Sequence, residues 1–304
     1  MLLQFILIPV LSPLGIGFIK KIKAKLQNRQ GASVLQPYKD LWKLFHKDEV
    51  ISTDASWIFK FAPFIVFTVT LIAGACIPIF ICTPHYTLSG DMLLLIYTLG
   101  IGTFFLALAG MDVGSSFGGL GSSREMTTSA LAEGGFIFSL LTLALIGGST
   151  NMLGISKSIA SEYSIYILPV ILAFIGFIIV LLCETKRYPF DNPATHLELT
   201  MIHEAMILEY SGKRLALMEW SAANKFLIFA TIGANLFFPW GLAHDIHISS
   251  LIFSLVAFVI KTSMFYITIA IIESSMAKFR FFRLPDLLII SFILNVIAIG
   301  MVRL

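Results

Sequence analysis

The chain has 304 residues, of which 57% are hydrophobic and only 13% are charged, and its mean hydropathy is +0.89. This composition excludes an ordinary soluble domain, in which roughly a quarter of the residues are charged. The formal net charge of +3 is small and indicates no nucleic-acid partner, because the basic residues lie where membrane topology would place them.

Eight segments are long and apolar enough to cross the hydrocarbon core of a bilayer, which requires about 20 predominantly apolar residues. They cover approximately residues 2–19, 61–82, 91–111, 128–149, 165–184, 225–244, 249–273 and 285–303. We therefore predict an all-α polytopic membrane protein with about eight transmembrane helices, together with cytoplasmic amphipathic and buried loop helices. No long linker or repeat divides the sequence, so residues 1–304 are predicted to form a single integral membrane domain.

Basic residues lie mainly on one side of these spans. Nine of the 21 lysines and arginines fall between Lys20 and Lys60, after the first span. Most of the others follow the third, fifth and seventh spans. Because basic loops stay in the cytoplasm, we predict a multi-pass protein of the cytoplasmic (inner) membrane with both termini on the outer side.

The first predicted cytoplasmic loop contains "QNRQGASVLQPYKDLWKLFHKD", residues 27–48. Its apolar residues Tyr38, Leu41, Trp42 and Phe45 recur at helical spacing, and lysines occupy a different face. This pattern predicts a short amphipathic helix suited to the headgroup layer. Two interpretations of the helix stay open, a membrane anchor and a docking surface for a cytoplasmic subunit.

The cysteines and glycines argue against a cofactor. Cys76, Cys82 and Cys183 lie within or at the ends of predicted spans and form no C-x-x-C pair. An ordinary iron–sulfur cluster needs four cysteine ligands, so we predict no redox centre and no cofactor. The glycine-rich stretch 112–125 lacks the Gly-Lys-Ser/Thr ending of a phosphate-binding loop and follows a membrane span rather than a strand.

An unusually polar segment, "PFDNPATHLELTMIHEAMILEYSG" at residues 189–212, interrupts the apolar sequence. It opens with an N-cap and a proline at 191–193 and ends with Ser-Gly at 211–212, which predicts one helix of about five turns. On such a helix Glu198 and Glu209 share one face.

The same segment holds His196 and His203, which are seven residues apart and therefore unsuited to binding one metal ion. Apolar residues surround its acids on most sides, which indicates a helix buried in protein or dipping into the membrane. Acids in such a setting have raised pKa values and can exchange protons near neutral pH. Further ionisable residues at membrane depth or at span ends are Asp112, Glu133, Glu184, Lys261 and Glu273.

One such residue alone is as often structural as functional, but the whole set favours a proton path. The residues predicted to contribute to it are Glu133, Glu184, Asp191, Glu198, Glu204 and Glu209. The histidines are expected to hydrogen-bond rather than relay protons. No catalytic residue and no metal ligand is predicted.

Three motifs occur in order on predicted cytoplasmic loops: "NRQGASVLQPYKDLWKLF", "GSSRE" and "ETKRYPFDNP…LEL…EYSG". They resemble the heel subunit of respiratory complex I, the NADH–quinone oxidoreductase. The resemblance is closer to the membrane subunits of group 4 nickel–iron hydrogenases, the family of hydrogenase 4 component C and formate hydrogenlyase subunit 4. It covers essentially the whole chain. The fitting positions are Arg29, Gly31, Leu35, Gln36, Asp40, Lys43 and Leu44; Gly121, Ser122, Arg124 and Glu133; and Glu184, Thr185, Arg187, Pro189, Phe190, Asp191, Glu198, Leu199, Glu209, Tyr210 and Ser211.

The resemblance implies a component of a membrane-bound oxidoreductase complex, without a redox centre or catalytic residues of its own. In the family these loops form the floor beneath the hydrophilic arm, and buried glutamates begin the proton path. The implied partners are hydrogenase-like large and small (iron–sulfur) subunits, antiporter-like membrane subunits and the lipid bilayer. The residues expected to dock the arm are Arg29, Gln36, Lys39, Asp40, Lys43, Arg124 and Arg187.

One departure separates the two branches of this family. The complex I pattern carries three closely spaced acids after "PFD", whereas Ala194 and His196 stand at two of those places here. The resemblance therefore favours the hydrogenase branch and does not carry quinone-binding residues over. Two alternatives stay open, a true complex I heel subunit that lines a quinone site and a stand-alone secondary transporter. The sequence does not distinguish H⁺ from Na⁺ as the transported ion.

Overall fold

The structure is a computed structural model that describes residues 2–79, 90–162, 165–191, 201–243 and 247–303. These residues form helices and no strand, which confirms the predicted all-α class. The helices are α1 (Leu2–Leu26), α2 (Gln36–Phe45), α3 (Trp57–Ala75), α4 (Met92–Asp112), α5 (Ser116–Gly147), α6 (Met152–Glu162), α7 (Ile167–Glu184), α8 (His203–Ile207), α9 (Gly212–Leu236), α10 (Ile248–Ser275) and α11 (Leu284–Arg303), with a short 3-10 helix, Phe281–Arg283, before the last.

Seven helical segments in the described part are long and apolar enough to cross a membrane, and they correspond to seven of the eight predicted spans. They are α3, α4, α5, α7, α9, most of α10, and residues 281–303 with α11. The chain is therefore an integral membrane protein. The other predicted span, residues 2–19, falls within α1, which is helical but is not among the seven. The first span thus stays a prediction.

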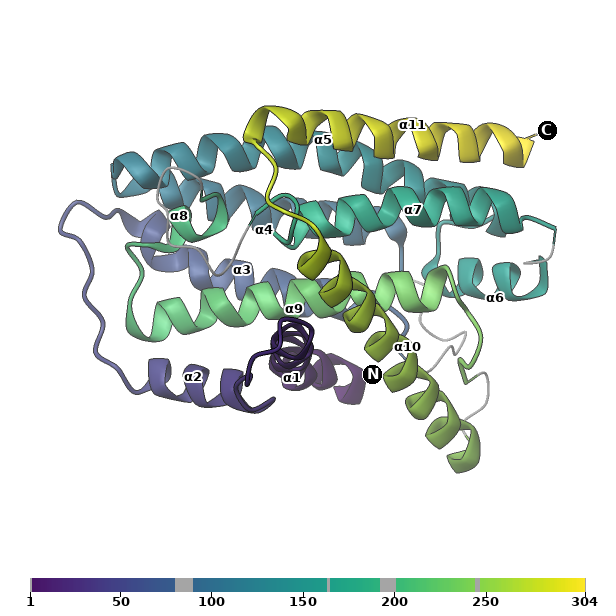
Figure 1. The fold of residues 1–304 in the computed structure, drawn as a ribbon, viewed down its shortest axis with the longest axis horizontal. Helices are drawn as coiled ribbons and strands as arrows, with labels where there is room; N and C mark the ends of the chain where they lie inside the picture. The colour runs from purple at the N-terminus through teal and green to yellow at the C-terminus, as the bar shows by residue number, and fades with distance from the viewer. Residues whose placement is uncertain (1, 80–89, 163–164, 192–200, 244–246, 304) are drawn as a thin grey trace.

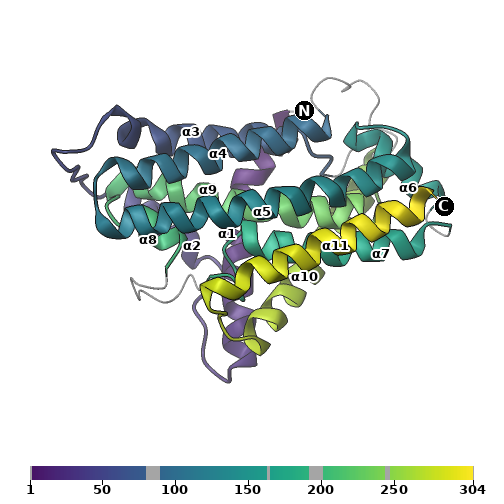
Figure 2. The same ribbon diagram turned by 90° about the horizontal axis from the view of Figure 1, so that it is seen from above.

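The long helices α3, α4, α5, α7, α9 and α11 run side by side along the longest axis of the molecule, whereas α10 crosses them obliquely (Figures 1 and 2). α2 and α8 lie at one end of this bundle and α6 at the other. We call the end with α2 and α8 the basic end, because the basic segments that follow α1, α7 and α10 meet there. The predicted gathering of basic loops is thus present, while the side of the membrane stays a prediction.

α9 forms the centre of the bundle. Two thirds (67%) of its most apolar window is buried, the largest share among the candidate spans. It packs against α1, α3, α7 and α10, and small side chains such as Gly233 permit this closeness. A Cβ at Gly233 would lie 2.6 Å from the ring of Phe265. Polar residues on α9 therefore face the protein interior rather than lipid.

The predicted amphipathic helix is present as α2 and begins with proline in its first turn. Tyr38 donates a hydrogen bond to the Val10 carbonyl oxygen, and the Phe45 ring packs edge-on against Trp220 at 6.1 Å. Its apolar face therefore rests partly on α1 and α9. Trp42 remains 70% exposed and is free to enter a headgroup layer.

The glycine-rich stretch 112–125 has the sequence of a loop, but most of it belongs to α5, which begins at Ser116 rather than near residue 128. Ser115 caps this helix by accepting a hydrogen bond from Gly118 N at 3.1 Å. A Cβ at Gly118 would collide with the Gly110 carbonyl oxygen. The glycines therefore serve close packing between α4 and α5.

The predicted five-turn helix across residues 191–212 is wrong. Residues 192–200, including Glu198 and His196, lie outside the described residues, and the next helix, α8, covers only His203–Ile207. Asp191 accepts hydrogen bonds from the backbone N–H groups of Ile202 (3.1 Å) and His203 (3.2 Å). It therefore caps a helix that begins eleven residues later than expected, and the shared face of Glu198 and Glu209 does not follow.

Candidate functional site

Two of the ionisable residues at membrane depth complete helix ends. Asp112 accepts hydrogen bonds from Ser56 N (2.9 Å), Ser56 Oγ (2.7 Å) and Phe59 N (3.2 Å), so it satisfies the N-terminus of α3. Lys261 donates to Asn235 Oδ1 (2.8 Å) and to the carbonyl oxygens of Phe238 (3.0 Å) and Trp240 (2.8 Å), just past the end of α9. Both have a structural role in helix capping.

Glu273 joins two cations at the basic end. Its side chain is fully buried and forms ion pairs with Lys23 (2.8 Å) and Arg187 (3.1 Å). The Arg187 guanidinium also lies over the ring of Phe226, 4.6 Å from its centre. This cluster fixes α1, the segment after α7, and α10 to one another.

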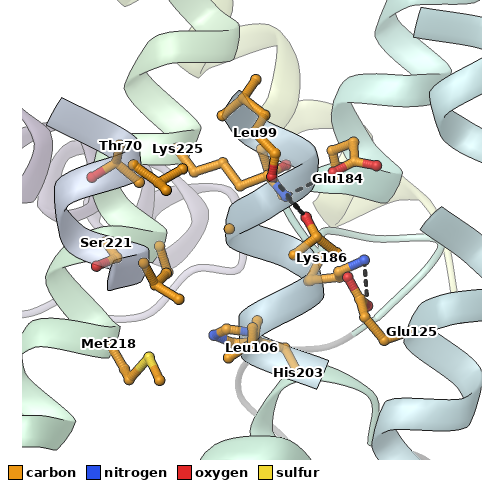
Figure 3. Close-up of a pocket in the computed structure, with 16 residues that line it drawn as sticks. Thr70, Leu99, Leu106, Glu125, Glu184, Lys186, His203, Met218, Ser221 and Lys225 are labelled. Atoms are coloured by element: carbon orange, nitrogen blue, oxygen red, sulfur yellow. Dashed lines mark hydrogen bonds and ion pairs between the residues drawn. The ribbon is translucent and has the colours of Figure 1, made fainter. Parts of the chain in front are cut away.

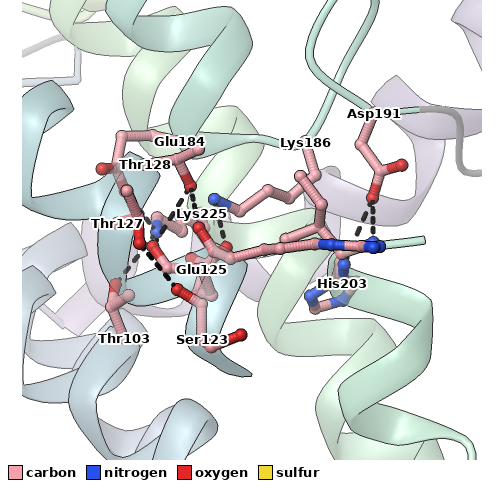
Figure 4. Close-up of polar contacts among 12 residues, drawn as sticks. Thr103, Ser123, Glu125, Thr127, Thr128, Glu184, Lys186, Asp191, His203 and Lys225 are labelled. Atoms are coloured by element: carbon pink, nitrogen blue, oxygen red, sulfur yellow. Dashed lines mark hydrogen bonds and ion pairs between the residues drawn. The ribbon is translucent and has the colours of Figure 1, made fainter. Parts of the chain in front are cut away.

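Asp191 is the second buried acid at this end, with 2% of its surface exposed. One carboxylate oxygen pairs with Lys278 Nζ at 2.6 Å, and the other accepts the two N–H groups at the start of α8. The carboxylate thereby orients His203, which projects from the first position of that helix (Figure 4).

Two further lysine–glutamate pairs lie deeper in the bundle. Lys225 Nζ on α9 lies 2.7 Å from Glu184 Oε2, at the last residue of α7, and 3.3 Å from Thr103 Oγ1 on α4. Lys186 Nζ lies 2.6 Å from Glu125 Oε2 on α5. Burial alone lowers the pKa of Lys186, but the Glu125 carboxylate more than offsets this and holds that pKa above its ordinary value. Both pairs are therefore charged.

Two cavities connect these groups. The smaller, of about 60 Å³, is lined by both lysine–glutamate pairs and by His203 (Figure 3). The larger, of about 1040 Å³, lies at the basic end and is lined by Asp191, Glu204 and many other charged residues. Lys186 and His203 line both cavities. The arrangement provides a polar route from the basic end to the interior of the bundle.

The acids and imidazole of α8 are tuned for proton exchange. Burial, together with the nearby carboxylates of Glu219 and Asp191, raises the pKa of Glu204 to about 7. Burial also lowers the pKa of His203 below its ordinary value, so its ring is neutral at pH 7. A neutral imidazole can both accept and donate a proton.

The remaining predicted path residues are placed differently. Glu133 is half-buried on α5 and lies near Gly100 of α4, away from both cavities. Glu209 is exposed at the basic end and lines neither cavity. Glu184, Asp191 and Glu204 are thus the predicted path residues that the two cavities bring together.

The predicted docking residues fall into two groups. Lys39, Asp40 and Lys43 are exposed on α2, where Gln36 Nε2 donates to Asp40 Oδ1 at 2.8 Å, and Arg29 is exposed just before it. Arg124 and Arg187 instead contact the chain itself. Arg124 donates to the Met201 carbonyl oxygen at 3.1 Å, and Arg187 is buried against Glu273.

Sequence reasoning missed Glu125, Lys186, Lys225 and Glu219 as site residues. Glu125 stands next to Arg124 in the "GSSRE" motif, and Lys186 stands between two selected residues, so their positions carried a signal. Lys225 stands out in the sequence only as a basic residue at the edge of a span. Its partner Glu184 is 41 residues away in sequence, and no periodic pattern reveals such a pair.

Comparisons with known proteins agree over the whole length of the chain. A family model described as NADH dehydrogenase matches residues 1–303. Hydrogenase-4 component C of Escherichia coli (strain K12) is 34% identical over 297 residues, which cover 98% of this chain and 93% of that protein. Formate hydrogenlyase subunit 4 of the same organism is 30% identical, with coverages of 92% and 90%.

More distant similarities extend to respiratory complexes. A membrane component of the NADH-quinone oxidoreductase of Pelagibacter ubique (strain HTCC1062) is 26% identical, with coverages of 93% of this chain and 87% of that protein. A chain in the structure of the membrane-bound sulfane sulfur reductase, an archaeal respiratory membrane complex, superposes with a TM-score of 0.79 at 20% identity, covering 99% of this chain and 97% of that one. The fold is therefore shared with that chain. On the match over residues 1–303 and the identities of 34% and 30%, the chain belongs to the NADH dehydrogenase family of membrane proteins, which includes hydrogenase-4 component C and the related component of NADH-quinone oxidoreductase.

Proposed function

We propose that this chain is the membrane-anchoring and ion-coupling component of a complex of the group 4 nickel–iron hydrogenase type. It holds a hydrophilic hydrogenase module at its basic end and admits the transported ion there. The similarity to hydrogenase-4 component C and formate hydrogenlyase subunit 4 over nine tenths or more of the chain supports this assignment. The described residues supply ion pairs and cavities but no group of three or more metal-ligating side chains.

The observation that carries the proposal is the junction between the two cavities. The larger cavity opens at the basic end, where a docked module would sit, and the smaller one reaches Glu184 and Lys225 inside the bundle. His203 and Lys186 belong to both. A carboxylate with a pKa near 7, Glu204, lies at the outer side of this junction, so the ion can be taken up at neutral pH with little driving force.

Docking is assigned to the exposed side chains of the basic end. Lys39 and Lys43 on α2, with Arg29 before it, present positive charge that suits an acidic surface of the hydrophilic subunits. Antiporter-like membrane subunits continue the path sideways, and the half-buried Glu133 is the acid of this chain closest to the outer face between α4 and α5. The basic end then faces the cytoplasm and both termini face outward.

Replacing Glu184 by glutamine in the intact complex tests the proposal. The amide keeps the shape and removes the titrating carboxyl, so the complex should assemble while ion movement per electron pair falls. Because the change leaves Lys225 without its counter-ion, the neutral double variant E184Q/K225M is measured beside it. Asp54→Asn is the control, since Asp54 is an exposed acid of the same end that lines neither cavity. Full coupling in an assembled E184Q/K225M complex would refute the path.

The volume of the larger cavity also fits a second function, a quinone site, since pockets for molecules of that size measure about 300–1,000 Å³. Its lining argues against this function. Charged groups such as Lys23, Asp191 and Glu273 face it, whereas a quinone ring needs a mostly apolar surface. Electron transfer that depends on added quinone and is blocked by quinone-site inhibitors would favour this second function.

A further inference from the structure

The smaller cavity has an unusual charge pattern. Glu125 and Glu184 contribute two carboxylates, and Lys186 and Lys225 contribute two ammonium groups, so its four charged groups sum to zero (Figure 3). Each ammonium lies 2.6–2.7 Å from a carboxylate oxygen of its own partner. The two acids are therefore already neutralised before any transported ion enters.

One carboxylate oxygen in this cavity is left over. Glu125 is completely buried, and its Oε1 atom has no hydrogen-bond partner among the described residues. A buried acceptor without a partner is costly, so the site calls for a small hydrogen-bonding ligand. The cavity of about 60 Å³ has room for roughly four water molecules, at 10–15 Å³ of accessible volume for each.

The other oxygen atoms that face the cavity are not arranged as a cage for a metal ion. Thr103 Oγ1 accepts a hydrogen bond from Lys225, and Thr70 Oγ1 accepts one from Asn224 Nδ2 at 3.1 Å. A hard cation needs several oxygen ligands that turn their lone pairs toward it. Here two of the candidate oxygens already turn toward donors on α9.

We propose that the ion admitted through this cavity is a proton carried on bound water, and that the two paired lysines exclude sodium. The inference rests on the proposed function, because it names the ion for the same route. A sodium ion would have to displace an ammonium group from its carboxylate and leave that ammonium buried without a counter-ion. A proton displaces nothing, because it bonds to an oxygen that is already present.

The proton transfer balances at each step. A proton that arrives on water bonds to Glu125 Oε1 and gives a neutral carboxylic acid. Lys186, which then faces no negative charge, releases one proton to the cavity water toward Glu184 and becomes a neutral amine. The acid returns its proton to that amine, which restores the Glu125–Lys186 pair. One proton has crossed the cavity, and no other atom has moved between groups.

The experiment compares wild-type complex with E125Q and with the neutral double variant E125Q/K186M, in everted membrane vesicles. E125Q leaves Lys186 buried and unpaired, and the double variant keeps the measurement interpretable if the single one does not assemble. Three quantities are measured: dye-reported proton uptake, the pH profile of turnover, and the KM for sodium, with sodium-22 uptake as a check. Because sodium can also enter through other subunits, the change in KM between variants is the site-specific readout.

We expect that proton uptake is lost and the pH profile of turnover shifts in the double variant, while any KM for sodium stays as in wild type. An increase in that KM with an unchanged pH profile would assign sodium to this cavity and overturn the inference. Unchanged pH profile and unchanged KM would place the ion elsewhere and overturn it as well. If E184Q/K225M abolishes coupling but the Glu125 variants change only sodium affinity, the proposed function stands and this inference alone fails.

Discussion

Replacing Glu273 by glutamine tests whether one buried carboxylate holds the cations of the basic end. The amide preserves shape but leaves Lys23 and Arg187, whose side chains are only 19% and 10% exposed, without their counter-ion. Removing one partner of a buried ion pair costs about 3–5 kcal/mol. Because Lys23 reaches solvent in part, we expect the lower end of that range, ~3 kcal/mol, or roughly 6 °C in Tm at ~2 °C per kcal/mol for a chain of this length.

The assay is the fraction of tagged protein that stays monodisperse in detergent after heating, measured as a melting curve. Glu209→Gln is the matched control, because Glu209 is exposed and an exposed substitution changes stability by no more than about 0.5 kcal/mol. A double variant in which Arg187 is also replaced by methionine should recover part of the loss, since it removes a buried charge. Equal melting curves for E273Q and E209Q would show that solvent or lipid headgroups replace the carboxylate, and would refute the reasoning.

Two other predictions concern a titration and a helix end. With its pKa raised from 4.5 to about 7, Glu204 binds its proton more tightly in the folded state, so stability is greatest below about pH 4.5 and declines as pH rises toward 7. E204Q should flatten the melting temperature over this window, and E219Q should move the midpoint downward, because it removes a neighbouring negative charge. Lys261→Met should lower Tm, since buried acceptors left unpaired cost about 1–3 kcal/mol each, yet it should leave the number of ions moved per electron unchanged. A loss of coupling in assembled K261M would contradict the capping role.

The fold was largely predictable because its main signals are local. Apolar length identified seven of the spans that the structure contains, and the apolar spacing from Tyr38 to Phe45 identified α2. These patterns depend only on the period of a helix and the thickness of a bilayer. The start of α5 at Ser116 was missed because glycines usually indicate a loop. Here they allow two helices to touch, which depends on a neighbour that is distant in sequence.

The candidate site was predictable only in part. Composition singled out Glu184, Asp191 and Glu204, since acids are rare in so apolar a chain. Their partners were not recognised, because Lys225 and Lys278 are separated from Glu184 and Asp191 by 41 and 87 residues. The cap-and-proline pattern at residues 191–193 predicted a helix start. In the structure the Asp191 carboxylate does cap a helix, but through a tertiary contact with Ile202 and His203.

Ionisable residues at membrane depth thus divide by partner rather than by depth. Asp112 and Lys261 bind backbone groups at helix ends, and such partners are fixed because the helix needs them whether or not an ion passes. Glu184 instead faces Lys225, a group that can itself gain or lose a proton, across a cavity with room for water. Burial makes every such charge dependent on its partner. A partner that can titrate is what turns a structural charge into a step on an ion path, and this criterion places Glu184 and Glu125 on the path and leaves Asp112 and Lys261 in the scaffold.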